Sequence, residues 1–155
     1  MTSIRQTEIA DLEHFFTFQL DKEAIFLAAF TSKDPGNKSA YIEKYTKLLN
    51  DPTVNHQTII VDNIIAGSVS KFEMDGHSEI TYWIDRKFWG KGVATSALGK
   101  LLEIENMRPV FARVAFDNIG SQKVLEKCGF IKVGSDKGFA NARQMEIEEF
   151  IYKLT

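Results

Sequence analysis

Apolar residues in the first third of the chain recur at intervals of three and four, the spacing that places side chains on one face of a helix. They predict helices over residues 9–29 and 41–49. Between these helices, residues 31–37 contain a Pro-Gly turn signal and form a loop-like break. Because that break is too short to be a domain linker, we expect one domain over residues 1–155.

After residue 52 the pattern changes to short runs of β-branched and aromatic residues, which is typical of strands. Tight turns are expected at Asp62-Asn63 and Asp75-Gly76. The predicted elements are strands at 58–61, 64–72 and 80–84, a helix at 92–105, a strand at 110–116, a helix at 118–127, and strands at 130–133 and 145–154. A single strand–helix–strand unit in an otherwise antiparallel series predicts an α/β fold with a mixed, mostly antiparallel central sheet and helices on both faces.

Composition narrows the class of protein. The chain has 155 residues, a formal net charge of 19 − 21 = −2, and no run of about 20 apolar residues. We therefore expect no nucleic-acid partner, no membrane span and, since the N-terminus lacks a signal-peptide pattern, a cytoplasmic protein. The single cysteine, Cys128, excludes a disulfide within the chain. With three widely separated histidines, no metal site is expected.

The segment most informative about chemistry is residues 80–95, where a strand leads through a basic, glycine-containing turn into a helix. Gly90 and Gly92 let backbone N–H groups approach a ligand without an intervening Cβ. The helix N-terminus adds free N–H donors and partial positive charge, and Lys87 and Lys91 add full charges. This combination predicts a site for a phosphate or pyrophosphate.

Several phosphate motifs are excluded by the spacing. A P-loop would need Gly-x-x-x-x-Gly-Lys-Ser/Thr, which is absent. A dinucleotide fingerprint would need Gly or Ala at its third position, where this chain has Thr95. A glycine turn that only starts a helix, with solvated lysines, remains an alternative reading.

Residues 87–92, Lys-Phe-Trp-Gly-Lys-Gly, resemble the Gln/Arg-x-x-Gly-x-Gly/Ala pyrophosphate motif of GNAT-superfamily acetyltransferases. Lys87 replaces the usual Gln or Arg and lacks the planar fork of arginine. A second stretch, residues 117–130, resembles the Asn-x-x-Ser/Ala…Gly-Phe segment of the same superfamily. The amino-acid sequences of both segments are most similar to those of the RimJ/RimL-like branch. The resemblance spans nearly the whole chain.

The resemblance implies an acetyl-CoA-dependent N-acetyltransferase that releases CoA. The strand before the turn would pair with the pantetheine arm, and a backbone N–H near Trp83 or Ile84 would stabilise the oxyanion. Asn118 would hydrogen-bond the pantetheine, and Lys123 could reach the 3′-phosphate or simply be solvated. The residues implied to bind acetyl-CoA are Tyr82, Trp83, Ile84, Lys87, Trp89, Gly90, Lys91, Gly92, Val93, Ala94, Thr95, Asn118, Ser121 and Lys123.

Amine attack on a thioester needs a proton acceptor and benefits from a proton donor. Glu79 is the candidate base, with a cross-strand ion pair to a lysine as the alternative reading and His77 as a weaker candidate. Many relatives carry a tyrosine as the acid where this chain has Leu125. Ser121, one helical turn earlier, is the substitute candidate; otherwise it is a small residue that lets CoA approach. Cys128 is expected to be a core residue.

The N-terminal helices and the last hairpin are implied to shape the acceptor pocket. The residues considered for it are Phe26, Phe30, Phe72, Phe139, the predicted turn 138–141, and the acids Glu73 and Asp75. The acceptor would be a small-molecule amine or a protein N-terminus, and the protein a monomer or homodimer. Two alternatives stay open: a catalytically silent CoA-binding regulatory module, suggested by Leu125, and a structural or partner-binding protein.

Overall fold

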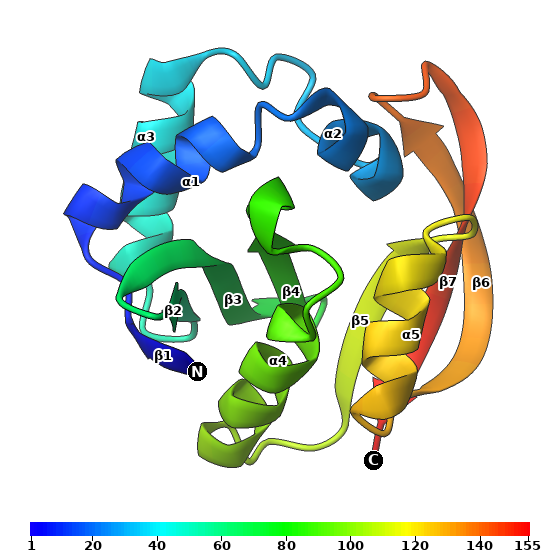
Figure 1. Ribbon diagram of the computed structural model, residues 1–155. Coiled ribbons are helices and arrows are strands. Elements are labelled where there is room, and N and C mark those ends of the chain that lie inside the picture. The colour runs from blue at the N-terminus through cyan, green and yellow to red at the C-terminus, as the bar shows by residue number, and fades with distance from the viewer.

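The computed structural model describes residues 1–155 and contains one seven-stranded sheet in the order β1-β2-β3-β4-β5-β7-β6 (Figure 1). The strands are β1 (Thr2–Gln6), β2 (Asn55–Val61), β3 (Ile64–Met74), β4 (His77–Ile84), β5 (Val110–Ala115), β6 (Ile131–Ala140) and β7 (Met145–Leu154). The helices are η1 (Ile9–Asp11), α1 (Leu12–Phe18), α2 (Lys22–Ala28), α3 (Lys38–Leu49), η2 (Arg86–Phe88), α4 (Val93–Ile104) and α5 (Ile119–Lys127). Only the β4–β5 pair, connected through α4, is parallel, so the predicted mixed sheet is confirmed.

Helices cover both faces of this sheet. On the first face, α4 and α5 pack on the main core, where Leu98 and Leu125 join Ile80 and Val110. On the second face, Ala29 at the end of α2 packs against Ala115 of β5 in a smaller cluster. The rings of α1 and α3 contact His56 of β2 on that same second face, because Ile59, three residues later, points into the main core. Figure 1 shows α4 and α5 in front of the strands and α1 to α3 grouped at the top.

The N-terminal region differs from the expectation in two ways. The sequence analysis did not predict β1, which pairs with β2 from Thr2↔Val61 to Gln6↔Gln57. In addition, the helix expected over residues 9–29 is three separate pieces, η1, α1 and α2. Asp21 begins α2 by accepting a hydrogen bond from Ala24 N at 2.9 Å, which explains the break before it.

The last hairpin is longer than expected. Strand β6 runs to Ala140, so residues 138–140 lie in the strand, and the predicted turn at 138–141 is wrong. The chain reverses at residues 141–144, where Gln144 has φ 51°. Strand β6 shows a register shift between Lys132 and Gly134 and then pairs with β7 as far as Ala140↔Met145.

A buried polar network holds the N-terminus to the sheet. Asp11 accepts hydrogen bonds from Arg5 Nη1 at 2.7 Å and from Thr58 Oγ1 at 2.8 Å. The Thr7 hydroxyl lies 2.9 Å from both His56 Nδ1 and Thr58 Oγ1. These bonds satisfy polar groups under α1 that would otherwise be costly to bury.

Two structural features bear on the class of function: helices that could cross a membrane and side-chain groups that could bind a metal ion. None of the helices combines the length and apolar character that a membrane crossing requires. The side chains also form no group of three or more His, Cys, Asp or Glu that could hold a metal ion.

Candidate active site

The site is built where strands β4 and β5 diverge. They pair at only two positions, Ser78↔Val110 and Glu79↔Phe111. Beyond Glu79, β4 stays paired with β3 as far as Ile84, while β5 stays paired with β7 as far as Ala115. The facing edges of β4 and β5 therefore carry backbone N–H and C=O groups with no strand partner, at the centre of the sheet.

The close approach of β3 to β4 fixes one side of this opening. At Gly67, a Cβ would lie 2.1 Å from the carbonyl oxygen of Trp83. Only glycine permits that distance, so Gly67 lets β3 lie directly beside the segment of β4 expected to contact pantetheine.

The basic glycine turn lies at the end of β4 and leads into α4. Gly90 and Gly92 have φ 73° and 74°, and Cβ atoms built on them meet nothing within 4 Å. Gly92 is the N-cap without a side-chain bond, and the first helical bond runs from Ser96 N to Gly92 O at 3.0 Å. The amides of Val93, Ala94 and Thr95 thus remain available at the helix N-terminus, as an anion requires.

The side chains of the turn support this shape. Trp89 Nε1 donates to Ile84 O at 2.9 Å and ties the turn to the strand before it. Phe88 is buried beneath, and the ammonium groups of Lys87 and Lys91 lie 5.6 and 5.9 Å from the centroid of its ring. Both lysines are exposed, as is Lys123 on α5. They can attract an anion from solution but form no closed cage.

Strand β4 and helix α5 are joined on the first face of the sheet. Tyr82 Oη lies 2.5 Å from Ser121 Oγ, and burial raises the pKa of Tyr82 to about 12. Tyr82 therefore keeps its proton at neutral pH. Leu125, at the position where the family resemblance implied a tyrosine, is 1% exposed in the main core and brings no polar group to the opening.

Asn118 is the N-cap of α5, and its side chain already forms hydrogen bonds within the protein. Its Oδ1 accepts from Ser121 N at 3.3 Å, and its Nδ2 donates to Leu27 O of α2 at 3.4 Å. Cys128 is half-buried against the core, and its thiol donates to Thr95 O at 3.6 Å. Burial raises the pKa of Cys128, which disfavours a reactive thiolate.

Glu79 approaches the opening from the second face. Strand alternation places it opposite Ile80 and Tyr82, and it is 5% exposed. Its carboxylate faces a guanidinium, with Arg113 Nε 3.7 Å from Glu79 Oε2. Burial raises the pKa of Glu79, Arg113 opposes that shift, and Glu149 adds to it. A carboxyl group with a raised pKa is suited to accept a proton near neutral pH.

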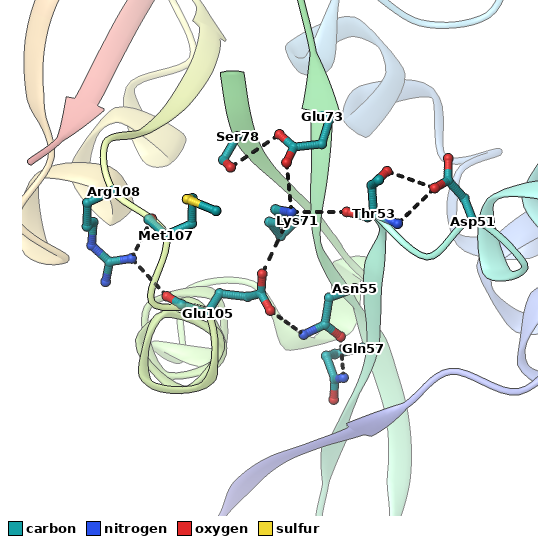
Figure 2. Close-up of polar contacts among 10 residues, drawn as sticks. All are labelled: Asp51, Thr53, Asn55, Gln57, Lys71, Glu73, Ser78, Glu105, Met107 and Arg108. Carbon is teal, nitrogen blue, oxygen red and sulfur yellow. Dashed lines mark hydrogen bonds and ion pairs between the residues drawn. The ribbon is translucent and has the colours of Figure 1, made fainter. Parts of the chain in front are cut away.

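Other acidic or basic residues named from the sequence lie elsewhere. His77 shares the strand with Glu79 but is exposed, with its ring 5.1 Å from that of Phe111. Glu73 lies on the first face, where it accepts from Lys71 Nζ at 3.1 Å and Ser78 Oγ at 3.2 Å (Figure 2). Since Ser78 and Glu79 are adjacent in a strand, Glu73 points away from the side of Glu79. Lys71 on β3 pairs with Glu73, and the cation that Glu79 meets across the strands is Arg113 rather than a lysine.

The end of α1 and helix α2 together are attached to both sides of the opening. On the β4 side, Trp83 Nε1 donates to Phe18 O at 3.3 Å, and Arg86 lies 3.3 Å from Asp21. On the other side, the Asn118 bond to Leu27 O joins α2 to the start of α5. The segment from Phe18 to Leu27 therefore connects the two diverging halves of the sheet.

The phenylalanines considered for the acceptor pocket separate into two groups. Phe72 lies directly across from Glu79, and Phe30 packs against the small cluster at the end of α2. Phe26 and Phe139 are 50% and 59% exposed on the outer surface. The guanidinium of Arg143 stacks on Phe26 at 3.8 Å, so that ring is engaged away from Glu79.

Sequence reasoning missed Arg113 and Glu149. Arg113 lies two residues beyond Phe111, the partner of Glu79, and its Nη1 lies 3.3 Å from Glu149 Oε1. The one available signal was the alternation within 110–115, where a charged residue interrupts an apolar strand.

Comparisons with known proteins identify the family of this chain. A family model described as an acetyltransferase (GNAT) domain matches residues 2–131. "Uncharacterized N-acetyltransferase p20" of Bacillus licheniformis is 25% identical over 165 residues, covering 98% of this chain and 91% of its own.

Among solved structures, the microcin C7 self immunity acetyltransferase MccE, in complex with acetyl-CoA and AMP, has TM-score 0.82 at 20% identity, covering 99% of this chain and 92% of its own. Spermidine N-acetyltransferase from Vibrio cholerae, in complex with CoA and spermine, has TM-score 0.80 at 20% identity, with coverage of 97% and 94%. These two structures support the fold. The match of the family model over most of the chain shows that it belongs to the GNAT acetyltransferase family.

Proposed function

We propose that this chain is an acetyl-CoA-dependent N-acetyltransferase that moves an acetyl group to a primary amine by direct attack on the thioester. One observation carries the proposal: the opening between β4 and β5 has Glu79 on one face of the sheet and the Tyr82–Ser121 pair on the other. A proton acceptor and a proton donor thus flank the same opening from opposite sides. Direct transfer needs this arrangement, because the amine arrives on one side and the thiol leaves on the other.

The residues present fit the cosubstrate. The unpaired edges of β4 and β5 offer hydrogen bonds to the amide groups of pantetheine, and the N-terminus of α4 offers amides to a pyrophosphate. The space beside Gly90 and Gly92 accommodates its close approach. When bound, acetyl-CoA supplies the thioester that the amine attacks.

The chain's own groups move the protons. Glu79 takes the proton of the incoming ammonium, because only the free amine is a nucleophile. Ser121 donates its proton to the departing sulfur, and the second proton that the nitrogen gives up as the amide forms restores the serine hydroxyl through solvent, while Glu79 releases its proton to solvent. In this assignment Tyr82 donates to Ser121 Oγ, which orients the serine proton away from the tyrosine. A backbone N–H of Trp83 or Ile84 stabilises the developing oxyanion.

The finer assignments are also proposals. They are one domain over residues 1–155, the RimJ/RimL-like branch, a cytoplasmic location, and an acceptor that is a small-molecule amine or a protein N-terminus. Support for one domain comes from the single continuous sheet, and support for an amine acceptor from the spermidine N-acetyltransferase with the same fold.

Calorimetric titration with acetyl-CoA, with NADH and ATP as controls, is the first test. Thiol release is then measured against a panel of small amines and N-terminal peptides. Binding followed by amine-dependent thiol release is the expected result. Binding without transfer across the panel would favour the silent CoA-binding module, for which the buried Leu125 is the supporting observation. No binding would overturn the proposal.

A further inference from the structure

A row of charged side chains runs diagonally across the second face of the sheet, starting from Glu79. Arg113 on β5 lies at its centre, with Nε 3.7 Å from Glu79 of β4. Its Nη1 lies 3.3 Å from Glu149 of β7 and 3.8 Å from Asp136 of β6. The register explains the row, because Asp136 pairs with Glu149 and Glu149 pairs with Ala115, two residues beyond Arg113.

The single guanidinium is shared unequally among three carboxylates. Glu149 accepts a hydrogen bond from Arg113, whereas Glu79 lies beyond hydrogen-bond distance of Arg113 Nε. The Glu79 side chain is nonetheless the most buried, with 7% of its area exposed against 18% for Glu149 and 65% for Asp136. Glu79 is the most buried of the three carboxylates and so the one for which an ionised form costs most without a counter-charge, yet it shares the charge of Arg113 with the other two.

We propose that Arg113 is a positioning residue for the candidate base Glu79, and that Glu149 limits its effect by binding the same guanidinium. The inference rests on the proposed function, in which Glu79 accepts the proton of the amine. Full pairing with Arg113 would lower the pKa of Glu79 and make it a weaker base, and loss of Arg113 would raise that pKa and reduce the ionised fraction of Glu79. Sharing with Glu149 keeps the carboxylate between these limits.

The other groups around Glu79 do not replace this control. Phe72 on β3 and Phe111 on β5 face it as uncharged partners. His77 lies two residues before it on β4 and is exposed, with its ring against Phe111, and it lowers the pKa of Glu79 less than Arg113 does. Asp136 on β6 contacts Arg113 and not Glu79. Burial raises the pKa of Glu149 as well, and its hydrogen bond with Arg113 opposes that shift.

The test measures the titration midpoint of Glu79 directly, by NMR of ¹³C-labelled glutamate carboxyls, with Glu79→Gln identifying the signal. Arg113→Gln should raise the midpoint and Glu149→Gln should lower it, each by about one pH unit. Arg113→Lys, which keeps the positive charge, should leave the titration midpoint of Glu79 close to that of the unmodified protein. Glu43→Gln, on the exposed surface of α3, is the matched control and should leave it unchanged. The acid limb of the kcat/KM profile should move with the midpoint.

Opposite shifts from two charge-removing variants are not expected of residues with a merely structural role. Midpoints that stay fixed in both variants, or that move in the same direction, would overturn the proposal. A midpoint that moves while the acid limb stays fixed would overturn it too, because Glu79 would then not be the base. Absence of thiol release from the unmodified protein would instead count against the proposed function, since the midpoints do not depend on turnover.

Discussion

The hydroxyl of Tyr82 on β4 lies 2.5 Å from the hydroxyl of Ser121 on α5, and this contact joins two elements on opposite sides of the strand divergence. Tyr82 is protonated at neutral pH, as any tyrosine is, and burial raises its pKa further, to about 12. Leu125, where the family resemblance implied an acid, is apolar and buried, and this pair brings the available hydroxyl groups to the opening.

Ser121→Ala should lower kcat by about tenfold, less than a typical general acid contributes, because a thiolate of pKa near 8.5 leaves readily. Tyr82→Phe should lower kcat by a smaller factor, since it removes only the group that orients Ser121. In the double variant the losses should not multiply, because both act through one hydrogen bond. Thiol release measures kcat, calorimetry checks that CoA affinity is retained, and Ser39→Ala on exposed α3 is the control. Losses of kcat that multiply in the double variant would show that Tyr82 and Ser121 act independently, and would contradict the prediction.

Gly92→Ala should lower both the affinity for acetyl-CoA and the free energy of unfolding, the latter by about 1 kcal/mol. A Cβ is strained at φ 74° and would stand where the pyrophosphate approaches. Gly99→Ala on α4 is the matched control, because its Cβ also meets nothing within 4 Å but lies inside a helix. This control should gain roughly 1 kcal/mol and keep its affinity. Urea unfolding and calorimetry measure the two quantities; equal affinities would remove the α4 N-terminus as the pyrophosphate site.

Gly67→Ala should lower the free energy of unfolding by about 2 kcal/mol or more, because its Cβ would meet the Trp83 carbonyl oxygen at 2.1 Å. Relief of this clash would displace β4 in the segment proposed to hold the thioester, so kcat should fall as well. Gly134→Ala in β6 is the control, since its Cβ has no neighbour within 4 Å. A Gly67→Ala variant as stable and active as the unmodified protein would show that β3 can shift freely.

Folding stability should fall as the pH drops from about 6.5 to about 4. Burial lowers the pKa of His56 to about 4, whereas in the unfolded chain it titrates near 6.5. Within that window the unfolded chain takes up a proton that the folded protein refuses, so stability present above the window is lost, to an extent on the order of 3 kcal/mol. Urea unfolding from pH 7.5 to 4.5 measures the loss.

His56→Gln should flatten this dependence on pH, and His14→Gln, at an exposed position on α1, should not. Asp11 contributes separately. Hydrogen bonds from Arg5, Glu8 and Thr58 outweigh its burial and lower its pKa, so its contribution is lost at more acidic pH. A slope that survives His56→Gln would assign the acid sensitivity to other groups.

Features that depend on neighbouring residues could be predicted from the sequence. The strand, glycine turn and helix of residues 80–95 are local, and each was recognisable from spacing and residue type. The short strand β1 was not, because its polar sequence takes its stability from pairing with β2 and from the Arg5–Asp11 bond. The end of β6 was misplaced for a similar reason, since Gly138 and Phe139 are held in the strand by pairing with β7.

The contacts between the candidate residues and their partners could not be predicted from the sequence, for a different reason. Tyr82 and Ser121 are 39 positions apart, and Arg113 and Glu149 are 36 positions apart. No periodicity within either segment indicates such pairs. They follow from the order of strands and from the register of β5 against β4 and β7, which are properties of the assembled sheet.

The divergence of β4 from β5 also bears on the lifetime of the protein. The backbone N–H and C=O groups at these two edges have no strand partner. They add to the stability of the folded state only when a ligand such as pantetheine forms hydrogen bonds with them. A ligand that binds the folded form alone, present at a hundred times its Kd, adds about 2.7 kcal/mol to stability. Under the proposed function, resistance to unfolding and proteolysis would therefore rise and fall with the supply of acetyl-CoA, and the abundance of the enzyme would follow the metabolic state of the cell.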